Sequence, residues 1–410
     1  FRPLFFYHNC EILLPLFPLI SAILWIFSFY DLYLLKKWQI TYQNLTLSFL
    51  ISFISAAAFI YFAAPILNIL TPKIVLLAVF VIYFCYIYIS RRLYANITFH
   101  KTNILVFGKS NTLNKLLKEL KDSKHYNVLA RYETVEDINC PKDIDLVLVS
   151  SKLFSQDKNA WALIAGKLLL KGYLLTTDLL MFEYVFKRIS KEGIKDNMWL
   201  LRGIAARGKH RTYQIIKRGI DILFSMILLP ALALPMLCVY ILIKIIDGFN
   251  PLFLQERVGK LENKIYIYKF RTMTPGTENI TKLGSILRRF RLDEMPQIIN
   301  IFKGDISIVG PSPLGTEDYY VLNKHVPSHS VRSVIQPGLT GWAQLNFKAP
   351  PNYSVVNLQG DILTDEIFDA AFNRLAYDVW YIKNRSLALD MEILLKTAKR
   401  AFIKDNTIKE

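Results

Sequence analysis

An apolar run at residues 222–243 constrains this chain most, because it is long enough to cross a bilayer as a helix yet contains two prolines. Pro230 and Pro235 each remove a backbone hydrogen bond and kink a helix that contains them. The stretches on both sides are basic and lack any sign of disulfides, which places both in one reducing compartment. We therefore predict a helix, a break and a second helix that enter and leave a membrane on one face.

The bulk composition indicates a membrane protein with an anionic partner. Of the 410 residues, 53% are hydrophobic, and the mean hydropathy of +0.28 is high for a soluble protein. The net charge of +17 suits nucleic acid, the acidic face of a membrane, or substrates that carry phosphate. No recognition motif supports nucleic acid. The four scattered cysteines are typical of a reduced protein without a cysteine metal site.

Residues 1–95 are predicted to form a transmembrane region. Three apolar segments there approach the ~20 residues that span a bilayer, at residues 12–29, 45–63 and 74–89. Lysines at 31–44 and cations after residue 91 place both stretches on the cytoplasmic side by the positive-inside rule. Because this leaves Phe1 on the outer face, we infer that one more helix precedes it.

Residues 100–195 are predicted to form a small Rossmann-like α/β domain with a parallel sheet. Strand-like runs begin at Asn103 and Ile144, and helical stretches follow at 113–120 and near 160–170. The first turn has a single glycine, Gly108, whereas a dinucleotide fingerprint needs three.

The role of this middle domain stays open between spacer, oligomerisation module and regulatory sensor, and homodimerisation stays open with it. A basic stretch at 196–215 is predicted to be a linker. It either lies along an anionic membrane surface or is a solvated connector.

An acidic pair, Asp293 and Glu294, follows a basic cluster that includes Arg288. An apolar helical run at 298–302 ends at Gly304, and a strand-like run follows at 306–309. Asp293 is either an ordinary N-cap or a functional carboxylate among cations that hold a phosphate ester. Consecutive helical residues do not share a face, so two functional acids would have different roles.

Further cations lie on short strand-like pieces and at the start of the apolar run. Arg257, Lys269 and Arg271 would reach the acidic pair in a compact domain. Lys217, Arg218 and Asp221 mark the point where the chain meets the membrane. Those cations either contact the phosphate of a lipid substrate or are simple anchors among headgroups.

The chain resembles the bacterial sugar transferase family, the monotopic polyprenyl-phosphate phosphoglycosyl transferases. The resemblance covers residues 213–400, and its motifs keep the family's order and approximate spacing. The matching stretches are KRGIDILFS from Lys217, QERVGK from Gln255, YKFRTM from Tyr268, LDEMPQIINIFKGDISIVGP from Leu292, PGLTGWAQLN from Pro337 and YDVWYIKNRSLALDMEIL from Tyr377.

The resemblance implies an α/β membrane protein with a catalytic domain at 216–410 and a re-entrant helix at 218–246 that breaks at Pro235. Longer family members carry four membrane helices and a nucleotide-fold-like domain in front, so this chain resembles one of those. It implies a bacterial inner-membrane enzyme with its site on the cytoplasmic face. That enzyme moves a sugar 1-phosphate from a UDP-sugar to polyprenyl phosphate and releases UMP.

The resemblance also implies roles for individual side chains. Asp293 would be the nucleophile, and Glu294 would serve in metal binding or proton handling, with Mg²⁺ held by this pair. Asp378 would lie at the nucleotide-sugar end, the alternative being an ordinary acid on a helix surface. The substrate phosphates would be bound by a set of cations: Arg257, Lys269, Arg271 and Arg288.

Three positions depart from the family pattern. Ser312 replaces an arginine, Gln336 stands where a basic residue is frequent, and Phe347 where glycine is frequent. Candidates for the missing charge are Lys324, Arg332 and Lys348. The substitution at Ser312 keeps an alternative open, namely a non-catalytic membrane scaffold or regulator of polysaccharide assembly.

Overall fold

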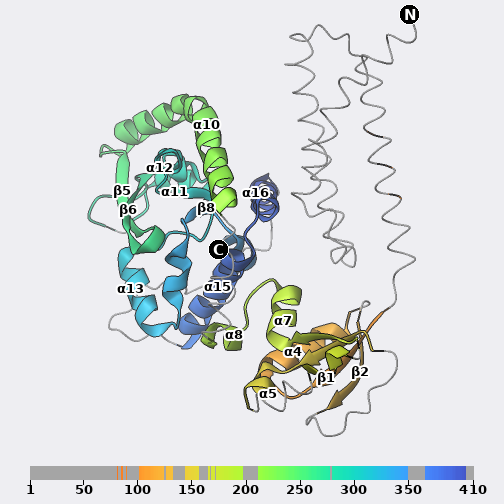
Figure 1. The fold of residues 1–410 in the computed structure, drawn as a ribbon. Helices are drawn as coiled ribbons and strands as arrows, with labels where there is room; N and C mark the ends of the chain where they lie inside the picture. Colours follow the sequence, from red (N-terminus) through yellow and green to blue (C-terminus); the bar gives the residue numbers. More distant parts are fainter. Residues whose placement is uncertain are drawn as a thin grey trace, which may run out of the picture. The chain divides into compact units, whose positions relative to one another are not determined.

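The structure is a computed structural model, drawn in Figure 1. It describes residues 81, 85, 89, 101–123, 126–132, 144–156, 165–166, 168–170, 172–196, 211–277, 279–349 and 365–402. The predicted membrane segments at 12–29 and 45–63, and most of 74–89, lie outside these residues. Residues 81, 85 and 89 are helical and exposed.

The middle domain is built on a four-stranded sheet in the order β2-β1-β3-β4. Its strands are β1 (Thr102–Phe107), β2 (Tyr126–Tyr132), β3 (Leu146–Val149) and β4 (Leu174–Thr177). β1 pairs with β3 and β3 with β4 in parallel, which confirms the predicted parallel α/β sheet. Helix α4 (Asn111–Lys121) follows β1 and is capped by Ser110, whose Oγ accepts from the Leu113 amide at 2.9 Å.

The segment after the sheet joins the core of the C-terminal domain. Helix α7 (Asp178–Phe186) leads to the short α8 (Lys191–Lys195). Ile189 and Ile194 are 2% and 0% exposed and belong to the same hydrophobic cluster as Ile301 and Phe372. The domain boundary predicted at residue 196 therefore falls after this docked segment.

Helix α10 (Arg211–Ile246) contains both prolines of the apolar run, Pro230 and Pro235. Figure 1 shows it bending into two arms, as expected for prolines inside a helix. It is long and apolar enough to cross a membrane, and only 11% of its most apolar window is buried. Its sequence thus leaves an apolar surface without a protein partner among the described residues.

Both arms of α10 contact the same C-terminal domain. In the first arm, the Asp221 carboxylate accepts from the Ile308 amide at 3.1 Å. In the second arm, Val239 and Ile243 are buried beside Phe270 and Leu287. The two ends of the apolar run therefore attach to one folded body.

The C-terminal domain combines two small sheets with surrounding helices. β5 (Leu252–Val258) and β6 (Lys264–Phe270) are antiparallel, and β7 (Ser307–Val309) and β8 (Gly338–Thr340) are parallel. The helices are α11 (Lys282–Arg289), α12 (Gln297–Lys303), α13 (Thr316–His325), α14 (Trp342–Asn346), α15 (Asp365–Asn384) and α16 (Leu387–Phe402), with 3-10 segments η4 (Leu292–Glu294) and η5 (His329–Val334). α12, its end at Gly304 and β7 confirm the predicted helix and strand.

Asn300 joins α12 to the outer edge of β6. Its Oδ1 accepts from the Tyr268 amide at 2.9 Å, and its Nδ2 donates to the Tyr266 carbonyl at 2.7 Å and to Asp305 Oδ2 at 2.9 Å. The side chain is 0% exposed, so water cannot replace these bonds.

We expect Asn300→Ala to lower the free energy of unfolding by about 2–3 kcal/mol, because it strands buried backbone groups without partners. Lys303→Ala is the control: it removes an exposed 2.7 Å contact to the Tyr268 hydroxyl from the same helix and strand. Denaturation in detergent measures both variants. Equal loss of stability in the two would contradict a specific role for the buried amide.

His329 is a buried, neutral histidine. It is 2% exposed and packs against the Tyr319 ring with centroids 5.4 Å apart. Burial, helped by the charges of Arg332 and Arg374, lowers its pKa from 6.5 to about 2. In the unfolded chain the same imidazole titrates near its ordinary value.

The native state should therefore lose stability as the pH falls below 6.5, where only the unfolded chain takes up this proton. The expected slope is about 1.4 kcal/mol per pH unit for one proton, and above 6.5 the contribution is constant. His329→Gln should remove that part of the slope. Unfolding measured between pH 5 and 8 tests this, and an unchanged slope in the variant would refute it.

Candidate active site

The acidic pair lies in η4, a 3-10 turn between α11 and α12. The turn begins at Arg291, which has a left-handed φ of 53° and occupies the N-cap position. Pro296 occupies the N-cap position of α12. The N-cap interpretation of Asp293 is therefore wrong, because Asp293 lies within the turn and caps neither element.

Four side chains act electrostatically on Lys269, after burial, which is the largest influence on it. The charges of Glu294 and Asp293 raise the pKa of the Lys269 ammonium, whereas burial, the largest influence, and the charges of Arg257 and Arg288 lower it. The net direction is downward. We call these five residues the active-site cluster. The structure thus brings together the predicted acidic pair and three of the predicted phosphate-binding cations.

Asp293 itself is half-buried. Burial and then the charge of Glu294 raise the pKa of its carboxyl group, and Lys269 and Arg288 oppose that rise. Arg288 is oriented by a 2.8 Å bond from its Nε to Thr272 Oγ1. A carboxylate in this position faces cations that would also attract a phosphate ester.

Arg271 and Asp378 lie in other surroundings. The Arg271 guanidinium lies over the rings of Phe249 and Phe253, 6.0 and 5.4 Å from their centroids. Asp378, on α15, is 2% exposed and lies 2.9 Å from Arg332. Burial raises the pKa of the Asp378 carboxyl, against the charges of Arg332 and Arg374.

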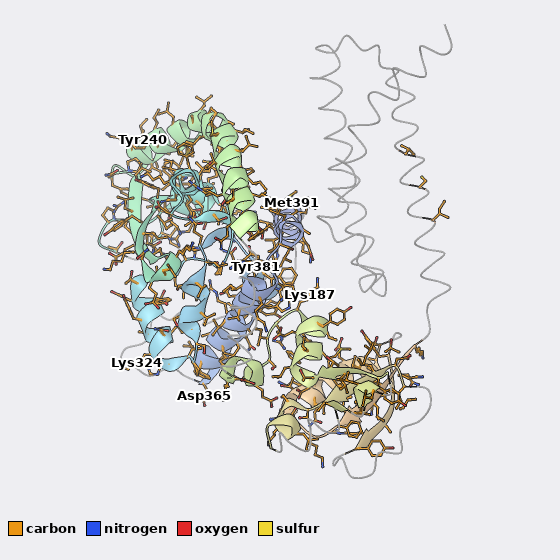
Figure 2. All side chains as sticks on the ribbon, in the orientation of Figure 1. Lys187, Tyr240, Lys324, Asp365, Tyr381 and Met391 are labelled. Atoms are coloured by element: carbon orange, nitrogen blue, oxygen red, sulfur yellow. The ribbon has the colours of Figure 1, made fainter. Side chains whose placement is uncertain are left out.

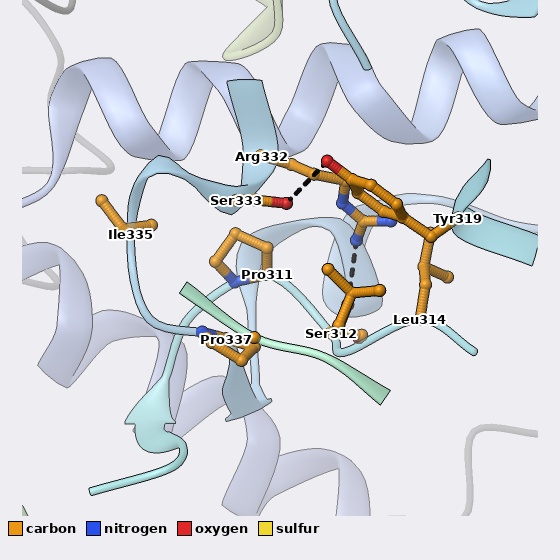
Figure 3. Close-up of a pocket in the computed structure, with 10 residues that line it drawn as sticks. Pro311, Ser312, Leu314, Tyr319, Arg332, Ser333, Ile335 and Pro337 are labelled. Carbon is orange, nitrogen blue, oxygen red and sulfur yellow. Dashed lines mark hydrogen bonds between the residues drawn. The ribbon is translucent and has the colours of Figure 1, made fainter. Parts of the chain in front are cut away.

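Arg332 links Asp378 to the Gly-Pro-Ser-Pro loop. Its Nη2 donates to the Ser312 carbonyl at 3.0 Å, at a small pocket that Tyr319 and Ser333 also line (Figure 3). Of the three candidates for the missing charge, Arg332 is the one at this loop. Lys324 and Lys348 are exposed, with Lys324 at the end of α13.

The start of β8 and the residue after β7 lie in close backbone contact beside this pocket. A Cβ on Gly338 would lie 2.0 Å from the Gly310 nitrogen, so this contact excludes any side chain at residue 338. The Gln336 side chain donates to the Gly304 carbonyl. Gln336 therefore joins the segment before β8 to the end of α12 by a hydrogen bond.

Lys217 and Arg218, which are predicted to lie at the membrane face, attach the first turns of α10 to the rest of the domain. Arg218 donates to the Ile301 and Phe302 carbonyls, both at 2.7 Å. Lys217 pairs with Asp390 at 2.8 Å. These contacts give both cations structural roles, and their contact with a lipid phosphate stays a prediction.

Asp390 was not singled out from the sequence. Its carboxylate also accepts from the Tyr213 hydroxyl at 2.7 Å and from the Tyr381 hydroxyl at 2.6 Å, and Tyr381 is labelled in Figure 2. Burial and Asp390 raise the pKa of Tyr381 well above its ordinary value. The available signal was a pair of acids, Asp390 and Glu392, in the mostly apolar first half of α16.

Asp293 and Glu294 are the adjacent carboxylates that the sequence predicts to hold a metal. Among the residues that the structure describes, no three His, Cys, Asp or Glu side chains come together. Two carboxylates suit Mg²⁺, which keeps waters and takes its remaining ligands from substrate phosphates.

Comparisons with known proteins identify the family of the C-terminal domain. Residues 212–404 match the model of the bacterial sugar transferase family. The chain is 34% identical over 199 residues to the Aeromonas hydrophila UDP-N-acetylgalactosamine-undecaprenyl-phosphate N-acetylgalactosaminephosphotransferase, covering 46% of this chain and 44% of that protein. It thus spans less than half the length of that relative.

Two shorter relatives are covered more completely. The exopolysaccharide production protein PSS of Rhizobium leguminosarum bv. phaseoli is 34% identical over 199 residues, 45% of this chain and 93% of the relative. The UDP-glucose:undecaprenyl-phosphate glucose-1-phosphate transferase of Caulobacter vibrioides is 32% identical over 204 residues, 46% of this chain and 71% of the relative. With its motifs, its fold and these matches, the chain belongs to the bacterial sugar transferase family.

Proposed function

We propose that the protein transfers a sugar 1-phosphate from a UDP-sugar to polyprenyl phosphate and releases UMP. The observation that carries this proposal is the active-site cluster, in which Lys269 and Arg288 act on the half-buried Asp293 carboxylate and Arg257 acts on Lys269. The names of the relatives support the same reaction class, since they act between nucleotide sugars and undecaprenyl phosphate. The identity of the sugar does not follow from either.

The proposed chemistry has two displacements at one phosphorus. Asp293 attacks the phosphorus that bears the sugar; a carboxylate oxygen–phosphorus bond forms as the bond to the UMP oxygen breaks. An oxygen of polyprenyl phosphate then attacks the same phosphorus, and the bond to Asp293 breaks. Lys269, Arg257 and Arg288 stabilise the phosphate charge in both steps.

Glu294 is assigned to metal binding or proton handling. Together with Asp293 it would hold Mg²⁺, which when bound would offset the charge of the diphosphate. Arg271 remains a predicted phosphate ligand, and Asp378 is assigned to the nucleotide-sugar end through its contact with Arg332.

The same proposal places the catalytic domain on the cytoplasmic face of the bacterial inner membrane. The apolar, mostly exposed α10 has both ends attached to this domain, which supports re-entry with a break near Pro235. Upstream membrane helices, a multi-pass topology and a homodimer belong to the proposal as well.

A non-catalytic scaffold is the second candidate, favoured by Ser312 in place of an arginine. The Arg332 guanidinium at the Ser312 carbonyl weakens that argument, because a cation is present at the loop. UMP release from a panel of UDP-sugars with undecaprenyl phosphate separates the two. A scaffold would release none with any sugar.

Asp293→Asn should lower UMP release by about 10³-fold or more, because the amide cannot act as a nucleophile. Asp369→Asn, at a half-exposed acid on α15, is the control and should keep wild-type turnover. A steady-state assay in detergent measures both. Full turnover in the Asp293 variant would exclude this residue as the nucleophile.

Withholding the lipid acceptor should trap the intermediate. We expect the wild type to retain label from a UDP-sugar radiolabelled in the sugar, and to lose it when undecaprenyl phosphate is added. Asp293→Asn should retain none. Denaturing gels with scintillation counting give the readout, and turnover without any labelled wild-type protein would instead favour direct transfer between the substrates.

A further inference from the structure

Helix α7 is fixed at its start to the edge of the middle-domain sheet. The Asp178 carboxylate is 0% exposed and accepts from Ser110 Oγ at 2.5 Å, the Ser151 amide at 2.8 Å and the Leu179 amide at 2.9 Å. Ser110 and Ser151 follow β1 and β3, at the carboxyl ends of parallel strands. Such edges commonly bind ligands in doubly wound domains, and here their donors bind the protein's own carboxylate.

The other end of α7 is fixed to the C-terminal domain. Glu183 forms a buried ion pair with Lys383 of α15, with Nζ 2.8 and 3.1 Å from the two carboxylate oxygens. The Glu183 carbonyl accepts from Trp380 Nε1 at 3.1 Å. Lys187, labelled in Figure 2, follows α7 with a φ of 50°, and its carbonyl accepts from Trp342 Nε1 at 3.0 Å.

Helix α15 also carries the acid assigned to the nucleotide-sugar end of the proposed site. Asp378 precedes Trp380 by two residues on α15 and pairs with Arg332, which donates to the Ser312 carbonyl. The Asp378–Arg332 pair is buried and the Arg332 contact to Ser312 is partly buried, so a shift of α15 would move the pair relative to the loop.

We propose that α7 connects the middle domain to α15, a role we call the interdomain clasp. In this proposal Glu183 is a positioning residue for the nucleotide-sugar end of the site. The edge of the middle-domain sheet then holds the start of α7, and the end of α7 holds α15 in position. Loss of one partner of a buried ion pair leaves the other charge uncompensated, so α15 depends on Glu183 for its position. The kinetic part of this inference rests on the proposed function.

Glu183→Gln should raise the KM for the UDP-sugar about tenfold and leave the KM for polyprenyl phosphate unchanged, because small displacements of positioned groups are costly. A merely structural role would reduce the amount of active enzyme and leave both KM values unchanged. Lys191→Gln is the matched control, since Lys191 pairs with Asp369 of the same helix at 2.6 Å but both side chains are about half exposed. It should leave both KM values at wild-type levels.

Trp380→Phe provides a second, milder variant if the first does not fold. It removes the indole donor to the Glu183 carbonyl and should raise the KM for the UDP-sugar about threefold. An unchanged KM in folded Glu183→Gln or Trp380→Phe, or an equal rise in Lys191→Gln, would overturn the clasp.

Thermal unfolding of the full chain tests the clasp without the reaction. We expect Glu183→Gln to separate the unfolding of the middle domain from that of the C-terminal domain, giving two transitions where Lys191→Gln gives the wild-type profile. A Glu183→Gln profile identical to wild type would overturn the clasp. If the wild type releases no UMP but Glu183→Gln still shows this separation, the proposed function alone is rejected.

Discussion

The polar attachment of α10 is the interaction on which the segment that follows the acidic pair depends. Most of the apolar window of this helix is exposed, so its position depends on directional bonds near its start as well as on the packing of Val239 and Ile243. Arg218 donates to two carbonyls in the last turn of α12, and the Asp221 carboxylate accepts from the Ile308 amide of β7. These two residues, one helical turn apart, fix both elements that follow the acidic turn. The helix that would meet the membrane is therefore attached to the two elements that directly follow the segment carrying Asp293.

Local sequence signals predicted much of this fold. The parallel strands β1 and β3, the end of α12 at Gly304 and the position of Lys269 on a strand all follow from short-range patterns. The grouping of Lys269 with Asp293 was also expected, since opposite charges in a compact domain attract. These features needed no knowledge of distant contacts.

What the sequence could not predict depends on partners far apart in the chain. Arg332 and Asp378 are 46 residues apart and meet only because η5 packs on α15. Asp390 collects donors from α10 and α15, and nothing in its own neighbourhood indicates them. From the sequence, the segment around Ile189 is assigned to the end of the middle domain. In the structure its side chains pack in the hydrophobic core of the C-terminal domain.

The amide of Asn300 has one more effect, on self-association. A two-stranded sheet has free outer edges, and a free edge can recruit a strand from another molecule. Asn300 offers β6 a carbonyl and an amino group in place of a neighbouring peptide. One side chain thus occupies the part of that edge between Tyr266 and Tyr268, which leaves less of it open to a strand from another molecule.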